Sequence, residues 1–299
     1  PYDVSLNRDL IMLLSEYTNL GKKLNWLSSQ VKMRELENFR CFRRENIKEQ
    51  EMPEEISMHF RGIDWVITRK SWEDKLGPVL AVKAGNNGEP HNQLDVGHFI
   101  LYVYGQQFLP DLGSGLYTKD YFGEARYKSP FCSAEGHSLI FIDGESEGVG
   151  KEFEGKIVSF ESGIDRDKIV VDLTNAYPSQ SIKNITRTLY FVKNRIDGQL
   201  ILEDSVSLNK NSEIGSRIQI NGEIERAGEK NFIVKGKYGN LYVEIKEPLK
   251  CRVEIGELSN LEFPDGTVKN VKFLDIVTHG RDTRFYVVFT PFRDRSELE

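Results

Sequence analysis

From Trp65 onward the chain consists of short apolar runs, rich in β-branched and aromatic residues, that end at Gly, Asn or Asp. The runs with the clearest pattern are WVITR, VLAVKA, HFILYVY, SLIFIDG, KIVSFES, KIVVDL, RTLYFVK, QLILEDSV, NFIVKG, NLYVEI, VKFLDIV and RFYVVFT. Such runs are typical of strands, and the regular turn signals between them favour antiparallel pairing. The sequence therefore predicts a mainly β fold, with one large antiparallel β-sandwich over residues 51–299.

A short α-helical segment is expected before the sandwich. Apolar residues recur at helical spacing from Ser5 to Leu20, where Gly21 is a stop signal, and again from Lys23 to about Phe39. Isolated helices of this length are marginal in water, so their apolar faces need a partner. We predict a helical domain with a linker over residues 1–50. Because the chain begins with Pro, we expect the partner helices to lie upstream in a longer protein.

The composition narrows the class of function. With 40 basic and 46 acidic residues the net charge is −6, which disfavours a general nucleic-acid binder but allows an acidic ligand on a local basic patch. Three separated cysteines, without CxxC spacing, indicate neither a disulfide framework nor a cysteine zinc site. No apolar run approaches the roughly 20 residues of a membrane span, and no signal segment opens the chain.

The stretch KAGNNGEPHNQLDVGHFILYVYGQQFLPDLG, from Lys83 to Gly113, combines a polar Gly-rich loop with an apolar strand. His91 lies in the loop, where binding residues tend to gather, and is either a site residue or an ordinary loop histidine. Asp95 is expected to orient the loop by accepting backbone N–H groups. His98 falls inside the strand, which favours a hydrogen-bonded core histidine.

Two further polar residues mark strand ends. Asp111 follows one strand and His137 precedes another, and side chains of these types on neighbouring strands can converge on one zinc ion. The alternative for Asp111 is a turn residue in LPDLGSG. Between them, Arg126, Tyr127 and Lys128 are candidates for substrate contact. The basic pair is equally compatible with a solvated surface, and the tyrosine with packing.

These pieces resemble, in order and spacing, the C-terminal β-sandwich of the heparinase II/III-like polysaccharide lyases. The family's Gly-rich loop with His-x-His-x-Asp, its Phe/Tyr strand, its strand ending in Asp-x-Gly and its later His before a strand are similar to KAGNNGEPHNQLD, HFILYVYG, QQFLPDLGSGLY and FCSAEGHSLIFIDG. The match covers roughly residues 56–145. The family carries an (α/α) toroid before the sandwich, which implies that residues 1–50 are its last helices and a linker.

The resemblance implies β-elimination on a uronate-containing acidic polysaccharide. The uronate carboxylate must be neutralised, a base must take the C5 proton and an acid must protonate the leaving oxygen. His91 takes the place of the family histidine near the substrate, and the remaining proton-transfer groups are expected on the upstream toroid domain. The implied partner is therefore the polysaccharide, with neither nucleic acid nor membrane, in the periplasm or outside the cell. This chain alone is expected to be inactive.

Some family members bind zinc through the second His of the pattern, the strand-end Asp and the later His. Asp111 and His137 match, but Gln93 stands at the second His, and a neutral amide is a poor zinc ligand. The three side chains then form a metal-free hydrogen-bonded group or bind a harder cation. Cys132 also replaces a frequent Arg. These departures permit an alternative function, a carbohydrate-binding sandwich that has lost lyase activity. A hydrolase of related toroid-plus-sandwich shape is a third reading.

Overall fold

The computed structural model describes residues 55–118, 121–123 and 125–293. Within them, a five-stranded antiparallel sheet has the order β1-β2-β3-β5-β6. Its strands are β1 (Ser57–Phe60), β2 (Trp65–Arg69), β3 (Val79–Lys83), β5 (Phe99–Val103) and β6 (Gln106–Leu109). The predicted helices over residues 1–50 lie outside the described residues.

An eleven-stranded antiparallel sheet has the order β12-β13-β14-β16-β11-β10-β9-β8-β4, with β15 on β16 and β7 on β11. Its strands are β4 (Gly85–Asn87), β7 (Ile140–Ile142), β8 (Gly150–Ser162), β9 (Arg166–Asp172), β10 (Ile182–Val192), β11 (Gln199–Ile220), β12 (Glu223–Arg226), β13 (Asn231–Lys235), β14 (Asn240–Glu247), β15 (Arg252–Glu262) and β16 (Val268–Phe292). Three 3-10 turns complete the structure: η1 (Arg126–Lys128), η2 (Ala134–Gly136) and η3 (Thr174–Ala176).

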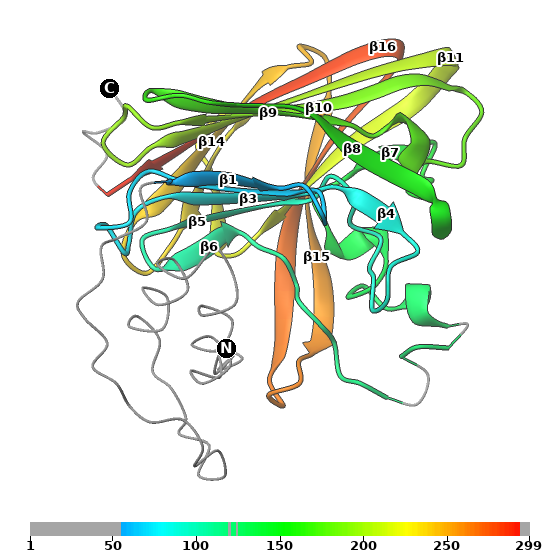
Figure 1. Ribbon diagram of the computed structural model, residues 1–299, viewed down its shortest axis with the longest axis horizontal. Coiled ribbons are helices and arrows are strands. Elements are labelled where there is room, and N and C mark those ends of the chain that lie inside the picture. The colour runs from blue at the N-terminus through cyan, green and yellow to red at the C-terminus, as the bar shows by residue number, and fades with distance from the viewer. Residues whose placement is uncertain (1–54, 119–120, 124, 294–299) are drawn as a thin grey trace. The chain divides into compact units, whose positions relative to one another are not determined.

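The two sheets pack face to face around one apolar core (Figure 1). Side chains alternate between the two faces of a strand, so every second residue of β10 and of most of β11 points into this core. Leu80 and Phe99 of the smaller sheet and Leu189 and Leu202 of the larger one belong to the same buried cluster. The predicted antiparallel sandwich is confirmed. No helix of the described part of the chain is long and apolar enough to cross a membrane.

Two strands are much longer than the sequence pattern suggests. The run QLILEDSV is only the first part of β11, which continues past a register shift between Ser207 and Ser212. The runs VKFLDIV and RFYVVFT belong to the single strand β16, which pairs with β11 along most of its length. The first part of β16 forms a hairpin with β15 that projects beyond the sandwich (Figure 1). The polar residues between the runs lie in a bulged part of the ladder, not in a turn.

The chain changes sheets at the start of the polar loop. Strand β3 ends at Lys83 in the smaller sheet, and β4 begins at Gly85 in the larger one, where it pairs with β8. Gly85 has φ +96, a conformation that glycine adopts without a steric penalty. The loop then returns to the smaller sheet through β5. We call residues His91–Asp95 the HNQLD loop. This loop therefore lies where the two sheets meet.

Candidate functional site

Three polar side chains converge at this end of the sandwich. The Nε2 atom of His98 lies 3.4 Å from Oδ2 of Asp111, and Nδ1 of His137 lies 3.3 Å from the same oxygen. The two imidazole rings meet edge to face, with their centroids 5.1 Å apart. Both histidines are buried and Asp111 is half-buried. We call these three residues the His–Asp–His cluster.

The strand pairing explains this convergence. His98 directly precedes β5, and Asp111 follows β6 after one proline. Because β5 and β6 are antiparallel neighbours, the start of one strand lies beside the end of the other. His137 comes from the larger sheet, at the end of η2 and just before β7. The cluster therefore joins residues of both sheets.

Gln93 is not one of the three residues of this cluster, and its role as a metal ligand stays a prediction. Its side-chain amide donates to the Gly113 carbonyl over 2.8 Å and ties the HNQLD loop to the turn after Asp111. His98 is the buried, hydrogen-bonded core histidine that the pattern indicated, and it also lies close to Asp111 and His137. Gln93 lies in the loop, whereas the start of β5 is the point that faces Asp111. The paired ends of β5 and β6 were the signal that could have identified His98.

Burial and proximity set the charges in the cluster. Burial lowers the pKa of His98 to about 3, so this imidazole is neutral at physiological pH. Burial opposes ionisation of Asp111, but the proximity of the His137 and His98 imidazoles outweighs it and holds the pKa of this carboxyl below its usual range. The cluster thus combines a carboxylate with at least one neutral imidazole, the protonation states that bind a metal.

The donor set fits zinc in type and spacing. One ligand atom from each of the three residues lies within 4.8 Å of the others, and two imidazoles with one carboxylate are a common zinc set. Among the described residues, His98 Nε2 and both His137 ring nitrogens have no hydrogen-bond partner. The Ser138 N–H donates to Nδ1 of His98 over 2.9 Å, which puts the proton of the neutral ring on Nε2. For a metal to bind at Nε2, this proton would have to move to Nδ1, and the hydrogen bond from the Ser138 N–H would have to break.

A cavity of about 500 Å³ lies beside the cluster. Its lining residues come mostly from the stretch between Lys83 and Gly113, and they include Trp65, Lys83, His91, Gln93, Asp95, His98 and Asp111. His91 is exposed and has φ +58, an uncommon conformation for a residue other than glycine. Backbone strain of this kind clusters at functional sites. The imidazole also meets the exposed ring of Phe122 at a centroid distance of 4.9 Å.

The three residues predicted to contact substrate lie around η1. Arg126 Nη2 donates to the Asn92 carbonyl, and the Tyr127 hydroxyl donates to Oδ1 of the same asparagine over 3.1 Å. Both side chains thus hold the HNQLD loop in place through their hydrogen bonds to Asn92. Lys128 is exposed and forms no ion pair within the described ranges. Substrate contact by these three residues stays a prediction.

Two buried carboxylates hold the base of the loop. Asp95 forms an ion pair with Lys83, where we had expected it to accept backbone N–H groups. Oε2 of Glu147 accepts hydrogen bonds from the Val96 N–H and the Asn87 side chain, both over 3.1 Å. Burial, reinforced by the nearby Asp95, raises the pKa of Glu147 to about 8. The sequence pattern gave no sign of Glu147, which lies in the turn SEGVG after β7.

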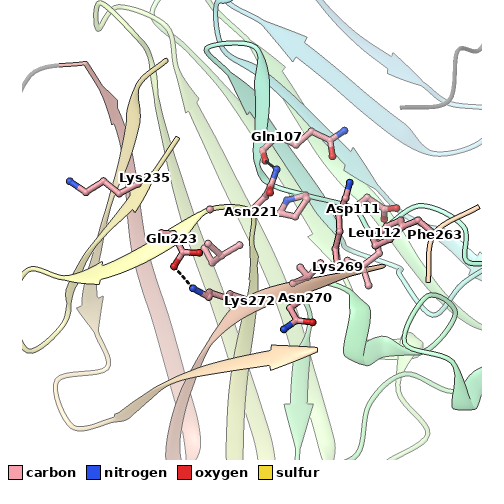
Figure 2. Close-up of a pocket in the computed structure, with 14 residues that line it drawn as sticks. Gln107, Asp111, Leu112, Asn221, Glu223, Lys235, Phe263, Lys269, Asn270 and Lys272 are labelled. Atoms are coloured by element: carbon pink, nitrogen blue, oxygen red, sulfur yellow. Dashed lines mark hydrogen bonds and ion pairs between the residues drawn. The ribbon is translucent and has the colours of Figure 1, made fainter. Parts of the chain in front are cut away.

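A second cavity, of about 510 Å³ (Figure 2), shares the lining residues Gln107 and Asp111 with the first. Lys235, Lys269 and Lys272 give it a basic wall. Lys272 is paired with Glu223 (Figure 2), and Lys235 is paired with Glu225 over 3.2 Å, so most of this charge is compensated. The first cavity combines an exposed imidazole, a strained loop and the cluster, and we take it as the candidate site.

Comparison with known proteins gives consistent matches. The family described as "Heparinase II/III-like, C-terminal" matches residues 52–286. A heparin-sulfate lyase of Pedobacter heparinus is 28% identical over 159 residues, which are 51% of this chain and 23% of that protein. The fold is similar to a heparinase III (TM-score 0.75, 17% identity, 97% of this chain and 41% of that one) and to heparan sulfate lyase HepC from Pedobacter heparinus (TM-score 0.74, 15% identity, 97% and 43%). The chain thus spans less than half the length of each.

We predict that Glu147→Gln changes the pH dependence of stability. The pKa of Glu147 is raised in the folded state, whereas an unfolded Glu titrates near 4.3, so the unfolded chain loses this proton first. Between about pH 5 and pH 8 this carboxyl should lower the free energy of unfolding by up to about 1.4 kcal/mol per pH unit. Urea denaturation across this range should show a flatter profile for the variant.

The matched control is Glu145→Gln, which removes a nearby exposed carboxylate. Its profile should run parallel to that of the unmodified protein. Parallel profiles for Glu147→Gln as well would show that Glu147 is ionised in the folded state.

Proposed function

This chain belongs to the heparinase II/III-like C-terminal family, and we propose that it is the C-terminal part of a lyase that cleaves a uronate-containing acidic polysaccharide by β-elimination. The observation that carries the proposal is the exposed, strained His91 on a cavity beside the His–Asp–His cluster. The names of its relatives favour a heparan-type polymer as substrate. Such a substrate implies a periplasmic or extracellular place of action.

His91 is the group of this chain that we assign to the reaction. Its imidazole lines the cavity and is exposed, so it can donate a hydrogen bond to the uronate carboxylate and exchange a proton near the C5 position. Asn92, braced by Arg126 and Tyr127, keeps the adjoining backbone in place. Among the described residues, His91 is the one to which we assign a step of the reaction. We therefore propose that the whole protein is needed for activity.

We further propose that His98, Asp111 and His137 hold Zn²⁺. The support is the donor set, the spacing and the unpartnered ring nitrogens. When bound, the ion would add positive charge beside the cavity and cross-link the two sheets. His98 and His137 would each have to present an unprotonated nitrogen to it.

A second candidate function is carbohydrate binding without catalysis. The observation that favours it is the exposed aromatic group beside His91, in which Tyr117 and Phe122 are 57% and 49% exposed. Exposed aromatic rings of this kind provide flat apolar faces for sugars. The replacements at Gln93 and Cys132 are compatible with either function.

We predict that His91→Ala in the full-length protein lowers kcat at least about 100-fold and changes KM only a few-fold, because the general acid–base contribution is lost while most sugar contacts remain. The assay is ultraviolet absorbance of the unsaturated uronate product, with heparin-like, chondroitin-like, hyaluronan-like and alginate-like polymers.

The control variant is His279→Ala, which removes an exposed histidine on β16 that faces Glu213, and it should leave turnover unchanged. Unchanged turnover in His91→Ala would refute the assignment of His91. Polymer binding without product from any polymer would favour the carbohydrate-binding function.

A separate prediction concerns the metal. Titration of the metal-stripped protein with zinc chloride in a calorimeter should show one site, because two imidazoles and one carboxylate offer ligand atoms within 4.8 Å of one another. His98→Ala should abolish this site.

Gln93→Ala is the matched control, because the side-chain amide lines the same cavity as His98 and donates to the Gly113 carbonyl. It should bind zinc as tightly as the unmodified protein. Equal losses in both variants would return Gln93 to the ligand set.

A further inference from the structure

A buried ion pair contacts the backbone beside two residues of the cluster. Arg187 of β10 and Asp204 of β11 are opposite each other in the antiparallel ladder, and both side chains are completely buried. The guanidinium donates twice to the carboxylate, from Nε to Oδ1 over 2.7 Å and from Nη2 to Oδ2 over 2.8 Å. The Ser216 hydroxyl donates to the same carboxylate over 3.2 Å. This bidentate geometry fixes the plane of the guanidinium.

The remaining nitrogen of the guanidinium reaches both histidine segments. Nη1 of Arg187 donates to the Gly97 carbonyl over 2.7 Å and to the Ser138 carbonyl over 2.6 Å. Gly97 precedes His98, and Ser138 follows His137. One nitrogen therefore joins the backbone of the smaller sheet to that of the larger sheet, immediately beside two members of the cluster.

The Ser138 backbone also contacts the ring of His98. The same Ser138 whose carbonyl accepts from Arg187 donates its N–H to Nδ1 of His98. In the metal-free protein, the position of Ser138 thus sets both the location of His137 and the orientation of the His98 imidazole. If the Ser138 backbone moved, both rings would move relative to Asp111.

The energetic cost of this arrangement argues for a specific role. Burying an ion pair is seldom favourable for stability, because desolvation of the two charges offsets their attraction, and well-packed apolar residues often serve equally well. The guanidinium has five donors in a rigid fork, so it can satisfy a carboxylate and two carbonyls at once. An apolar pair would leave those carbonyls unsatisfied.

We propose that Arg187 is a positioning residue, which holds His98 and His137 at the separation needed to bind a metal together with Asp111. This inference rests on the zinc site of the proposed function. Arg187 acts through the Gly97 and Ser138 carbonyls, with Asp204 as the group that fixes its plane.

The test is the double variant Arg187→Met/Asp204→Leu, which removes both charges together and leaves no unpaired buried charge. In zinc chloride titrations of the metal-stripped protein, its Kd should rise about 10- to 100-fold, the usual effect of losing a group that orients metal ligands. The control is Lys193→Met/Asp167→Leu. It removes another buried ion pair, whose hydrogen bonds within the described residues go to Ser57, Thr68 and Gly163 among others but to neither histidine segment. Its zinc Kd should stay within about two-fold.

Nitrogen-15 spectra of the histidine rings in the metal-free protein give a readout independent of zinc. The Nδ1 signal of His98 should lose its hydrogen-bonded character in the first double variant and keep it in the control. An unchanged Kd together with an unchanged His98 signal would overturn the proposal. If the unmodified protein binds no zinc, the metal site fails, and the His98 signal alone decides whether Arg187 positions this ring.

Discussion

The change of sheets between Lys83 and Gly85 is the constraint on which the site depends. Within three residues the chain leaves the smaller sheet and joins the larger one, and it must then return to begin β5. The returning segment is the HNQLD loop. Because its two ends are fixed in different sheets, the loop stays over their junction, and Glu147 secures it from below through Asn87 and Val96.

The polar groups of the site follow from that junction. His98 and Asp111 come from the β5–β6 hairpin of the smaller sheet, whereas His137 precedes a strand of the larger one. Buried polar groups need partners, and within the described residues His98 Nε2 and both His137 ring nitrogens have no hydrogen-bond partner, which supports the proposal that a metal binds there. The outer, exposed residue is His91. A buried cluster therefore supports a loop that carries the proposed reactive group.

Much of the fold was predictable because apolar runs with β-branched residues mark strands that bury one face. The prediction missed β15 and the later part of β11, where charged residues alternate on exposed faces and the apolar signal is weak. In the site, Asp111 and His137 were found from their places at strand ends. The place of His98 beside Asp111 and His137 was not predicted, because spacing along the sequence does not show which strand ends lie side by side. The sequence pattern did not indicate the roles of Arg187 and Glu147, because these roles depend on contacts with residues 40 or more positions away.

The most direct test of the central claim is a crystal structure of the full-length His91→Ala protein with a uronate-containing oligosaccharide. The account predicts sugar density in the cavity lined by Lys83, the HNQLD loop and Asp111, with a uronate carboxylate facing the space left by the His91 ring. Sugar bound only in the second cavity, beside Lys269 and Asn221, or elsewhere on the sandwich would contradict it.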